Sequence, residues 1–263
     1  MDTQLINRMQ NLVNSRVDDD INKNIANYIL QNIYDIDKLT ISDLAANTYA
    51  STASISRFAR SVGCENFNDL KQRMSDNHNI EEAFKNNLKD IDFKSKRPFK
   101  TYVENIVNAL QNMEEMIDMK EVDELIKEIY ENENVYFLGH NFPGLLAQHA
   151  QRSLILAGKY VHTYDSAMSH LDVANQCPKD SVVIVFSMNG QYLQQNKEIG
   201  DIFKKRHIRL ILITQVGKPV FANYFNKIIT IGDQYDSNAG RYKLELFMEI
   251  MVNRYVDLYH KNK

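Results

Sequence analysis

Apolar residues between Thr40 and Gly63 recur at the spacing of two short amphipathic helices with a tight break between them. In the first helix, Ile41, Leu44 and Ala45 fall at i, i+3 and i+4, so one stripe of this helix faces a core. Thr40 and the acid three residues later fit a capping box, which predicts where the helix begins. Two short helices separated by a turn are typical of a helix-turn-helix.

The second helix is expected to begin after Ser51, a good N-cap, and to end at Gly63. Its apolar positions recur at i, i+3, i+4 and i+7, namely Ile55, Phe58, Ala59 and Val62. The opposite face has no acid and carries small, hydroxylic or guanidinium side chains. Small side chains let a helix enter the major groove, and arginine contacts guanine or phosphate there. The residues expected to contact DNA are Ser51, Thr52, Ala53, Ser56, Arg57 and Arg60.

Periodicity alone leaves a second interpretation open, because two short helices joined by a turn also occur in helical domains that never touch DNA. The local charge favours DNA. Residues 51–74 contain four basic and two acidic residues, whereas the whole chain has a formal net charge of −3. This balance excludes a broadly cationic surface that coats nucleic acid without sequence preference.

Residues 1–75 are expected to form an all-α helix-turn-helix domain. Apolar residues at helical spacing both precede and follow the helix pair, namely Ile21, Ile25, Tyr28, Ile29 and Ile33, then Phe67, Leu70 and Met74. Residues 76–101 are polar and mixed in charge, and Pro98 interrupts a continuous helix. We expect a linker there, with a helical segment around residues 80–88.

Residues 102–263 are expected to form an α/β domain. After helical segments over residues 102–131, short β-branched runs alternate with helices, and the runs cover residues 135–138, 160–164, 181–187, 209–214 and 227–231. The expected helices cover residues 144–157, 168–176, 192–206 and 241–260. Strands that are apolar throughout and separated by helices form a parallel sheet covered on both faces. The pattern predicts a doubly wound, five-stranded parallel sheet.

Ligands of such sheets bind outside the carboxyl ends of the strands, where loop N–H groups and helix N-termini converge. The loops over residues 139–144, 187–192 and 214–219 are therefore expected to hold a small molecule. Four histidines, at positions 140, 149, 162 and 170, lack the spacing of metal ligands. The sequence predicts no metal, no cofactor and no catalytic residue, since it has no Gly-x-Ser-x-Gly elbow either.

Length and composition are those of a globular protein, with 263 residues, of which 44% are hydrophobic and 25% charged. Cys64 and Cys177 lie far apart and without redox or metal spacing, which indicates reduced thiols. The N-terminal residues lack a signal pattern, and no apolar run is long enough to span a membrane. We expect a cytoplasmic protein with no membrane partner.

A family resemblance rests on motifs in both halves. TISDLA at 40–45, STASISRFARSVG at 51–63 and FNDLKQRM at 67–74 resemble the RpiR/MurR-type bacterial transcriptional regulators, whose second half is a sugar-isomerase (SIS) domain. The SIS layout fits FLGHNFPG at 137–144, LAGKYV at 156–161, VIVFSMNGQ at 183–191, LILIT at 210–214 and NRYVDLY at 253–259. This resemblance covers almost the whole chain. It implies a double-stranded DNA operator and an effector that is a sugar phosphate or a related carbohydrate.

The phosphate loops depart from the family pattern. SIS domains usually carry Gly-x-Gly-x-Ser after the first strand and Ser-x-Ser-Gly-x-Thr after the third. Here the second Gly and the Ser of the first loop are replaced, and Tyr192 stands at the Thr position of the second loop. The residues left as candidates for effector binding are His140, Asn141, Ser187, Asn189, Gly190 and Tyr192. Two alternatives stay open, an altered phosphosugar site or a degenerate pocket that holds another metabolite or nothing.

The last helix is apolar on more than one side, as an interface helix is, and its aromatic residues are Tyr242, Phe247, Tyr255 and Tyr259. A homodimer would place two recognition helices on a palindromic operator. Three hypotheses follow. The first is a regulator in which the effector changes the relative orientation of the DNA-binding domains. The second is a sugar-phosphate isomerase with Glu245 or His140 as base, and the third an interaction module with two decayed sites.

Overall fold

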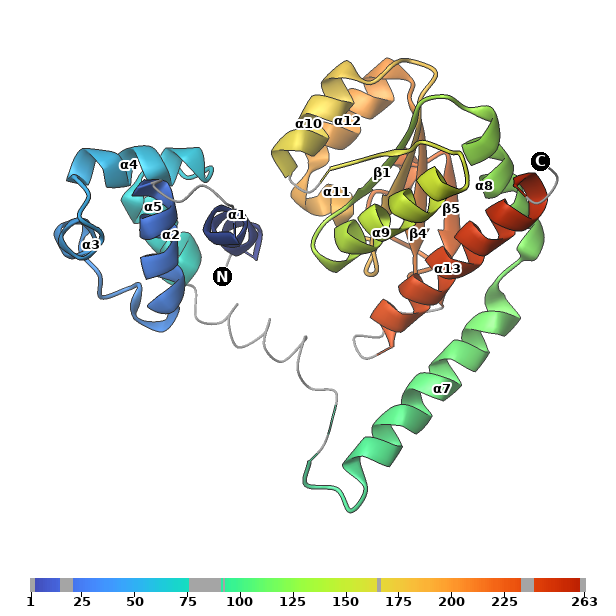
Figure 1. Ribbon diagram of the computed structural model, residues 1–263, viewed down its shortest axis with the longest axis horizontal. Coiled ribbons are helices and arrows are strands. Elements are labelled where there is room, and N and C mark those ends of the chain that lie inside the picture. The colour runs from blue at the N-terminus through green and yellow to red at the C-terminus, as the bar shows by residue number, and fades with distance from the viewer. Residues whose placement is uncertain are drawn as a thin grey trace. The chain divides into compact units, whose positions relative to one another are not determined.

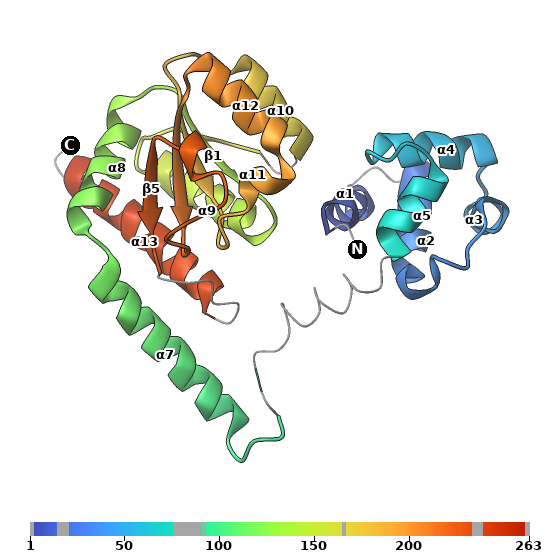
Figure 2. The same cartoon turned by 180° about the vertical axis from the view of Figure 1, so that it is seen from behind.

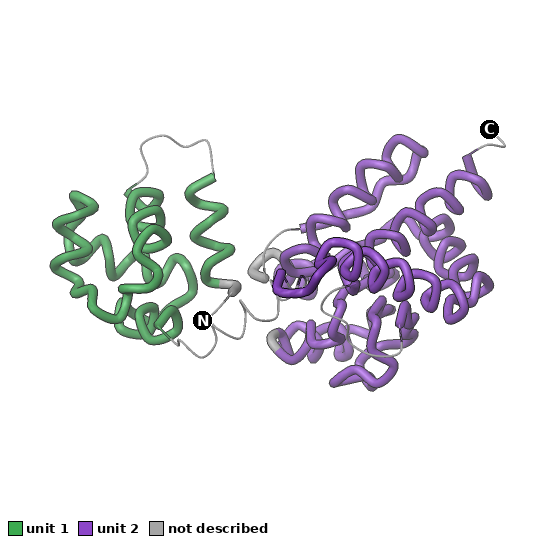
Figure 3. The backbone as a smooth tube through the Cα atoms, turned by 90° about the horizontal axis from the view of Figure 1, so that it is seen from below, with its two compact units in different colours: residues 1–89 green, residues 90–263 purple. Residues whose placement is uncertain are grey.

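The structure is a computed structural model that describes residues 3–14, 21–75, 91, 93–164, 167–232 and 239–260. It divides into two compact units, residues 1–89 and 90–263 (Figure 3). Most of the expected linker, including the helical segment expected around residues 80–88, lies outside the described residues. None of the described helices is long and apolar enough to cross a lipid bilayer.

Unit 1 is helical, as expected. Its described elements are α1 (Thr3–Asn14), α2 (Ile21–Gln31), the 3-10 helix η1 (Ile33–Asp35), α3 (Ile41–Thr48), α4 (Thr52–Ser61) and α5 (Phe67–Ser75) (Figure 1). One apolar core joins these helices around Leu5, Ile29, Leu44 and Phe58, all of which are fully buried. Ile21 is 38% exposed because it is the first residue of α2, at the end of the predicted apolar stripe.

Unit 2 is an α/β unit with one parallel sheet. In the described residues its strands are β1 (Val135–Gly139), β2 (His162–Thr163), β3 (Val182–Phe186), β4 (Arg209–Thr214) and β5 (Lys227–Thr230). They lie in the order β2-β1-β3-β4-β5, and every neighbouring pair is parallel. This arrangement confirms the predicted fold class.

Helices cover both faces of the sheet (Figures 1 and 2). On one face α8 (Met119–Glu131), α9 (Phe142–Leu156) and α13 (Gly240–Tyr259) pack on alternate strand residues such as Phe137 and Ile184. On the other face α10 (Ala167–Gln176), α11 (Tyr192–Gln195) and α12 (Lys197–Arg206) pack on the residues between them, such as Leu138 and Val183. The central strands β1 and β3 are apolar and buried throughout because helices cover both faces. The 3-10 helix η2 (Ala222–Tyr224) precedes β5.

Three expected boundaries were wrong. The helix α7 (Pro98–Met116) begins inside the expected linker, because proline fits the first turn of a helix, where no N–H partner is needed. The single helix expected over residues 192–206 is broken at Asn196, whose side-chain amide donates to the Tyr192 carbonyl 2.8 Å away. The strand expected over residues 160–164 is reduced to the two residues of β2.

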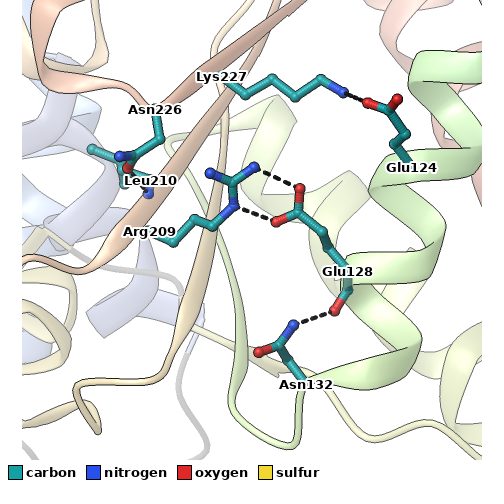
Figure 4. A network of polar contacts seen from close by, with 7 residues as sticks. All are labelled: Glu124, Glu128, Asn132, Arg209, Leu210, Asn226 and Lys227. Carbon is teal, nitrogen blue, oxygen red and sulfur yellow. Dashed lines mark hydrogen bonds and ion pairs between the residues drawn. The ribbon is translucent and has the colours of Figure 1, made fainter.

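Ion pairs fasten α8 to the amino ends of two strands (Figure 4). The Arg209 guanidinium donates two hydrogen bonds to the Glu128 carboxylate, and the Lys227 amine lies 2.6 Å from Glu124. On the other side of α8, Arg254 of α13 donates to both carboxylate oxygens of Asp123 at 2.9 Å. These contacts leave the opposite edge of the sheet, at the carboxyl ends of the strands, for a ligand.

Candidate functional site

The first helix of the pair, α3, begins with a complete capping box. The Thr40 hydroxyl accepts from the backbone N–H of Asp43 at 3.1 Å, and the Asp43 carboxylate accepts from the backbone N–H of Thr40 at 3.1 Å. These hydrogen bonds from Thr40 lower the pKa of the Asp43 carboxyl. The helix ends at Thr48, and Tyr49 follows with φ of +54°, which reverses the chain direction. The expected capping box is confirmed.

The second helix, α4, begins at the expected N-cap. The Ser51 hydroxyl accepts from the backbone N–H of Ser54 at 3.0 Å, and the two hydroxyls lie 2.9 Å apart. Arg57 donates to the same Ser54 hydroxyl at 2.9 Å. Ser54 is buried and was not among the residues expected at the site. Its hydroxyl connects the helix N-terminus to the first arginine of the exposed face.

The residues expected to contact DNA lie together on one surface of unit 1. Ser51, Thr52, Ala53, Arg57 and Arg60 are exposed, and Ser56 is half-buried with its hydroxyl donating to the Thr52 carbonyl. The opposite side of α4 is in the core, through Ile55, Phe58 and Ala59. The structure therefore leaves an acid-free face of α4 open to a partner.

Arginines hold the carboxyl end of α4. Arg8 of α1 donates to the Val62 carbonyl at 2.6 Å, and Arg73 of α5 donates to the Gly63 carbonyl at 2.9 Å. Gly63 has φ of +89°, and a Cβ there would lie 2.0 Å from the Arg8 guanidinium. Both ends of α4 are thus fixed by side chains from within unit 1.

Beside α4, a groove of about 380 Å³ runs between the amino ends of α3 and α5. Ser56 lines it on the side of α4, and Lys71 lines it on the side of α5. The Lys71 amine donates to the Leu39 carbonyl at 3.0 Å. The sequence marks Lys71 only as one of the four basic residues in 51–74. Its position on this groove depends on how α3 and α5 pack.

In unit 2, the loops expected to hold a ligand leave the sheet side by side, since Gly139 of β1 pairs in register with Phe186 of β3. The first loop is tight. A Cβ on Gly144 would lie 2.7 Å from the Gly139 carbonyl oxygen, and Asn141 has φ of +58°. Asn141 is exposed, in the loop next to the one that follows β3.

The loop after β3 satisfies its own polar groups. The Asn189 side-chain oxygen accepts from the Gln191 backbone N–H at 3.2 Å, and the Asn189 amino group donates to the Gln191 side chain at 2.8 Å. The Ser187 hydroxyl is buried and donates to the Asn189 oxygen at 3.4 Å. Gly190 has φ of +68°, and a Cβ there would lie 2.6 Å from the Pro219 side chain. The Asn189 side-chain oxygen therefore accepts the hydrogen bond that the Gln191 backbone N–H could otherwise donate to a ligand oxygen.

Tyr192, at the position of the family threonine, points into the protein. Its hydroxyl lies 3.0 Å from Nδ1 of His170, and its ring stacks on His140 with centroids 4.9 Å apart. The centroids of the two histidine rings lie 4.8 Å apart. Burial raises the pKa of Tyr192, which keeps it a neutral phenol. Three aromatic rings thus fill the space between α10, α11 and the loop after β1.

Hydrogen bonds link both histidines of this cluster to their neighbours. Because a carbonyl only accepts, His170 Nε2 donates to the Tyr164 carbonyl at 3.1 Å, and its Nδ1 lies 3.0 Å from the Tyr192 hydroxyl. The Asn196 amino group donates to the Tyr192 carbonyl and also, at 2.9 Å, to Nε2 of His140. His140 therefore accepts at Nε2, and His170 donates at Nε2.

Of the residues expected to bind an effector, the structure brings His140 and Tyr192 into contact and places Ser187, Asn189 and Gly190 in one loop. His170 and Asn196 complete the cluster and were missed. No local pattern marks them, since His170 reaches Tyr192 from another helix. The general-base candidate Glu245 lies on an exposed side of α13, between the buried residues Leu244 and Phe247.

Sequence reasoning also missed Lys243. This lysine is only 6% exposed, one turn into α13, and among the described residues no acid forms an ion pair with it. The first residue of α13, Gly240, packs on Gln215, and the Gln215 backbone N–H donates to the Met188 carbonyl at 3.3 Å. A buried cation thus lies in the helix whose amino end reaches the loops after β3 and β4. Buried charges call for an opposite charge or strong hydrogen bonds.

Residues 3–80 match the family model of the helix-turn-helix domain, rpiR family. An uncharacterized HTH-type transcriptional regulator of Bacillus subtilis, YbbH, is 23% identical over 197 residues, covering 73% of this chain and 68% of that protein. Unit 1 therefore carries a helix-turn-helix domain of the rpiR family. The chain aligns with NanR of Vibrio vulnificus, solved in complex with ManNAc-6P, with a TM-score of 0.55, 18% identity and coverage of 98% and 94% of the two chains.

The second unit has the fold of a sugar isomerase domain. The sugar isomerase domain of an RpiR transcription factor from Sphaerobacter thermophilus aligns with a TM-score of 0.50 and 11% identity, over 62% of this chain and 93% of that one. At these identities the structural matches show the fold alone.

Proposed function

We propose that α4 is the helix with which this RpiR-type regulator reads its operator. The observation that carries the proposal is the exposed, acid-free face of α4, on a helix whose two ends are fixed within unit 1. The small residues Thr52 and Ala53 in its first turn allow the helix to approach the base edges closely. Arg57 and Arg60, one turn further on, supply contacts to guanine or phosphate.

The hydrogen bond from Arg57 to Ser54 supports this assignment. A guanidinium has five N–H donors, so one bond to the Ser54 hydroxyl leaves others for DNA while it limits the freedom of a long side chain. Arginine loses less entropy on binding when it is already held in place. Arg57 is therefore proposed as the principal contact, with Arg60 contributing through the same face.

The proposed effector is a sugar phosphate or a related anionic carbohydrate, bound at the carboxyl ends of β1 and β3. Lys243 is buried near the amino end of α13 and has no ion-pair partner among the described residues, which supports an anion, and Ser187 and Asn141 offer polar groups in the loops after β3 and β1. NanR of Vibrio vulnificus, which shares the fold, was solved with ManNAc-6P. The internal hydrogen bonds of Asn189 mean that the effector must be held differently from the usual family pattern.

We further propose that the protein works as a cytoplasmic homodimer and not as an enzyme. Two copies of α4 would contact two half-sites about one helical turn apart, and effector binding would change their spacing. The curated relative matched above is a transcriptional regulator, which supports regulation over turnover. Glu245, the acidic base candidate for an isomerase, is exposed.

Selection from randomised duplexes with the full chain tests the DNA proposal. We expect enrichment of a palindrome whose half-site centres lie about 34 Å apart, or a multiple of that spacing. Enrichment of no sequence over the input pool would contradict operator recognition by this chain.

Thermal unfolding with a panel of hexose and amino-sugar phosphates tests the effector proposal. A phosphosugar at 100 times its Kd stabilises the protein by about 2.7 kcal/mol, and Lys243→Met should abolish that shift. Lys120→Met, at an exposed position on α8, is the control and should keep it. Wild-type protein that no phosphosugar stabilises, or Lys243→Met with an unchanged shift, would contradict the proposed site.

A further inference from the structure

The helix α7 carries an apolar seam that unit 2 covers only in part. Its residues follow the 4-3 spacing of a coiled-coil heptad, namely Phe99, Val103, Ile106, Leu110 and Met113. Of the residues of α7, all of which the structure describes, Met113 alone is buried. Phe99 and Val103 are exposed, and Ile106 and Leu110 are half-buried. A helix with such a seam ordinarily has a partner along its whole length.

Among the described residues α7 packs against α13, but most side chains in its first half stay exposed. The helix runs beside α13 (Figures 1 and 2), and the Tyr102 hydroxyl lies 3.1 Å from that of Tyr242. An apolar groove of about 530 Å³ remains between the two helices. Val107, Leu110 and Glu114 line it from α7, and Leu246 and Ile250 line it from α13. The groove has the dimensions and the chemistry to receive apolar side chains from another helix.

The charges at the ends of α7 run against its helix dipole. Arg97 and Lys100 stand at the amino end, and Glu114 and Glu115 stand in the last turn. Anions are favoured at a helix amino end and cations at a carboxyl end, so this distribution destabilises an isolated helix. Lys100 is offset in part by an exposed ion pair with Glu104 at 3.4 Å. The arrangement suits a partner helix that presents the reverse order of charges.

We propose that this partner is the α7 of a second copy of the chain, lying antiparallel in the groove between α7 and α13. Lys100, Val107 and Glu114 are spaced by seven residues and share one side of the seam. When two copies cross at Val107 and run in opposite directions, Lys100 of each faces Glu114 of the other. A parallel pair would instead place like charges together. Two α7 helices and two α13 helices then form a four-helix arrangement.

The inference rests on the proposed homodimer, but the interface can be tested separately from the dimer itself. Light scattering coupled to size-exclusion chromatography on the full chain should give a dimer for wild type and a monomer for Val107→Glu. Val220→Glu is the matched control, since Val220 is 48% exposed and Val107 is 46% exposed. A monomeric wild type would overturn both the homodimer and this interface. A dimeric Val107→Glu would overturn the interface alone.

Cross-linking tests the crossing point without a destabilising charge. Val107→Cys should form a disulfide between two copies under mild oxidation, because a residue on the twofold axis meets itself. Val220→Cys should remain reduced, and the native Cys64 and Cys177 are buried. A Val107→Cys dimer that never cross-links would overturn the proposed crossing.

Charge reversal tests the antiparallel direction. Lys100→Glu alone and Glu114→Lys alone should each raise the dimer dissociation constant by about fivefold or more, since each creates two like-charge contacts per dimer. The variant with both changes restores opposite charges across the interface and should regain wild-type affinity. Single variants with wild-type affinity, or a double variant as weak as the singles combined, would overturn the antiparallel pairing.

Discussion

The hydroxyl of Tyr192 lies 3.0 Å from Nδ1 of His170, and both side chains are buried. This contact joins α11 to α10 across the carboxyl edge of the sheet. It also turns the residue at the family threonine position inward, away from any ligand phosphate. At this position of the loop, a buried aromatic contact therefore stands where the family pattern has a hydroxyl group.

Replacing Tyr192 by Phe should destabilise unit 2. The variant keeps the ring but removes the hydroxyl that lies 3.0 Å from the buried His170 Nδ1, and the loss of a buried hydrogen-bond partner costs about 1–3 kcal/mol. Chemical denaturation followed by circular dichroism measures the difference in unfolding free energy. Tyr224→Phe is the control, since it removes a hydroxyl that donates to Asp201 at the surface and should change stability little. Equal losses for both variants would contradict the assigned role of the buried pair.

Thr40→Ala should weaken the start of α3. Loss of an N-cap side chain typically destabilises a helix by about 1 kcal/mol. The same change removes the hydroxyl that holds the pKa of the Asp43 carboxyl below its usual range, so an NMR titration should show that pKa rising. Gln72→Ala, at an exposed position on α5, should alter neither quantity. An unshifted Asp43 titration would show that the capping box does not form.

The stability of unit 2 should depend on pH through His162. This ring stacks on Tyr136 with centroids 4.5 Å apart, and burial lowers the pKa of His162 below 6.5. The unfolded chain therefore binds a proton more readily, so this contribution is complete above pH 6.5 and is lost as the pH falls through and below that value. His162→Phe keeps the stack and removes the titration. Unfolding measured from pH 8 to pH 5 should decline less steeply for the variant, and parallel curves would refute this assignment.

The helix pair was predictable from local sequence because its signals act over four residues or fewer. Thr40 with Asp43, and Ser51 with the turn that follows it, satisfy backbone N–H groups within one helical turn. The central strands were predictable because burial on both faces leaves apolar runs, such as VVIVF in β3 and LILI within β4. The limits of β2 were not, since an edge strand has a single neighbour and β2 pairs with β1 over two residues.

The composition of the effector site could only be predicted in part. Topology placed His140 and Ser187 at neighbouring strand ends, where the structure has them. The burial of Lys243, the break at Asn196 and the contact of His170 with Tyr192 arise from tertiary packing between elements far apart in the chain. Side chains whose partners lie on other helices leave no periodic pattern in the sequence.

The central claim is that α4 reads DNA, and operator affinity of an Arg57→Ala variant tests it most directly. A gel-shift titration at fixed salt should show binding weakened by about 1–3 kcal/mol, and the salt dependence should fall by about one charge if Arg57 contacts phosphate. Arg152→Ala, at an exposed position on α9, is the matched control and should bind like wild type. Arg57→Ala protein that binds the operator as tightly as wild type, at every salt concentration, would contradict the account.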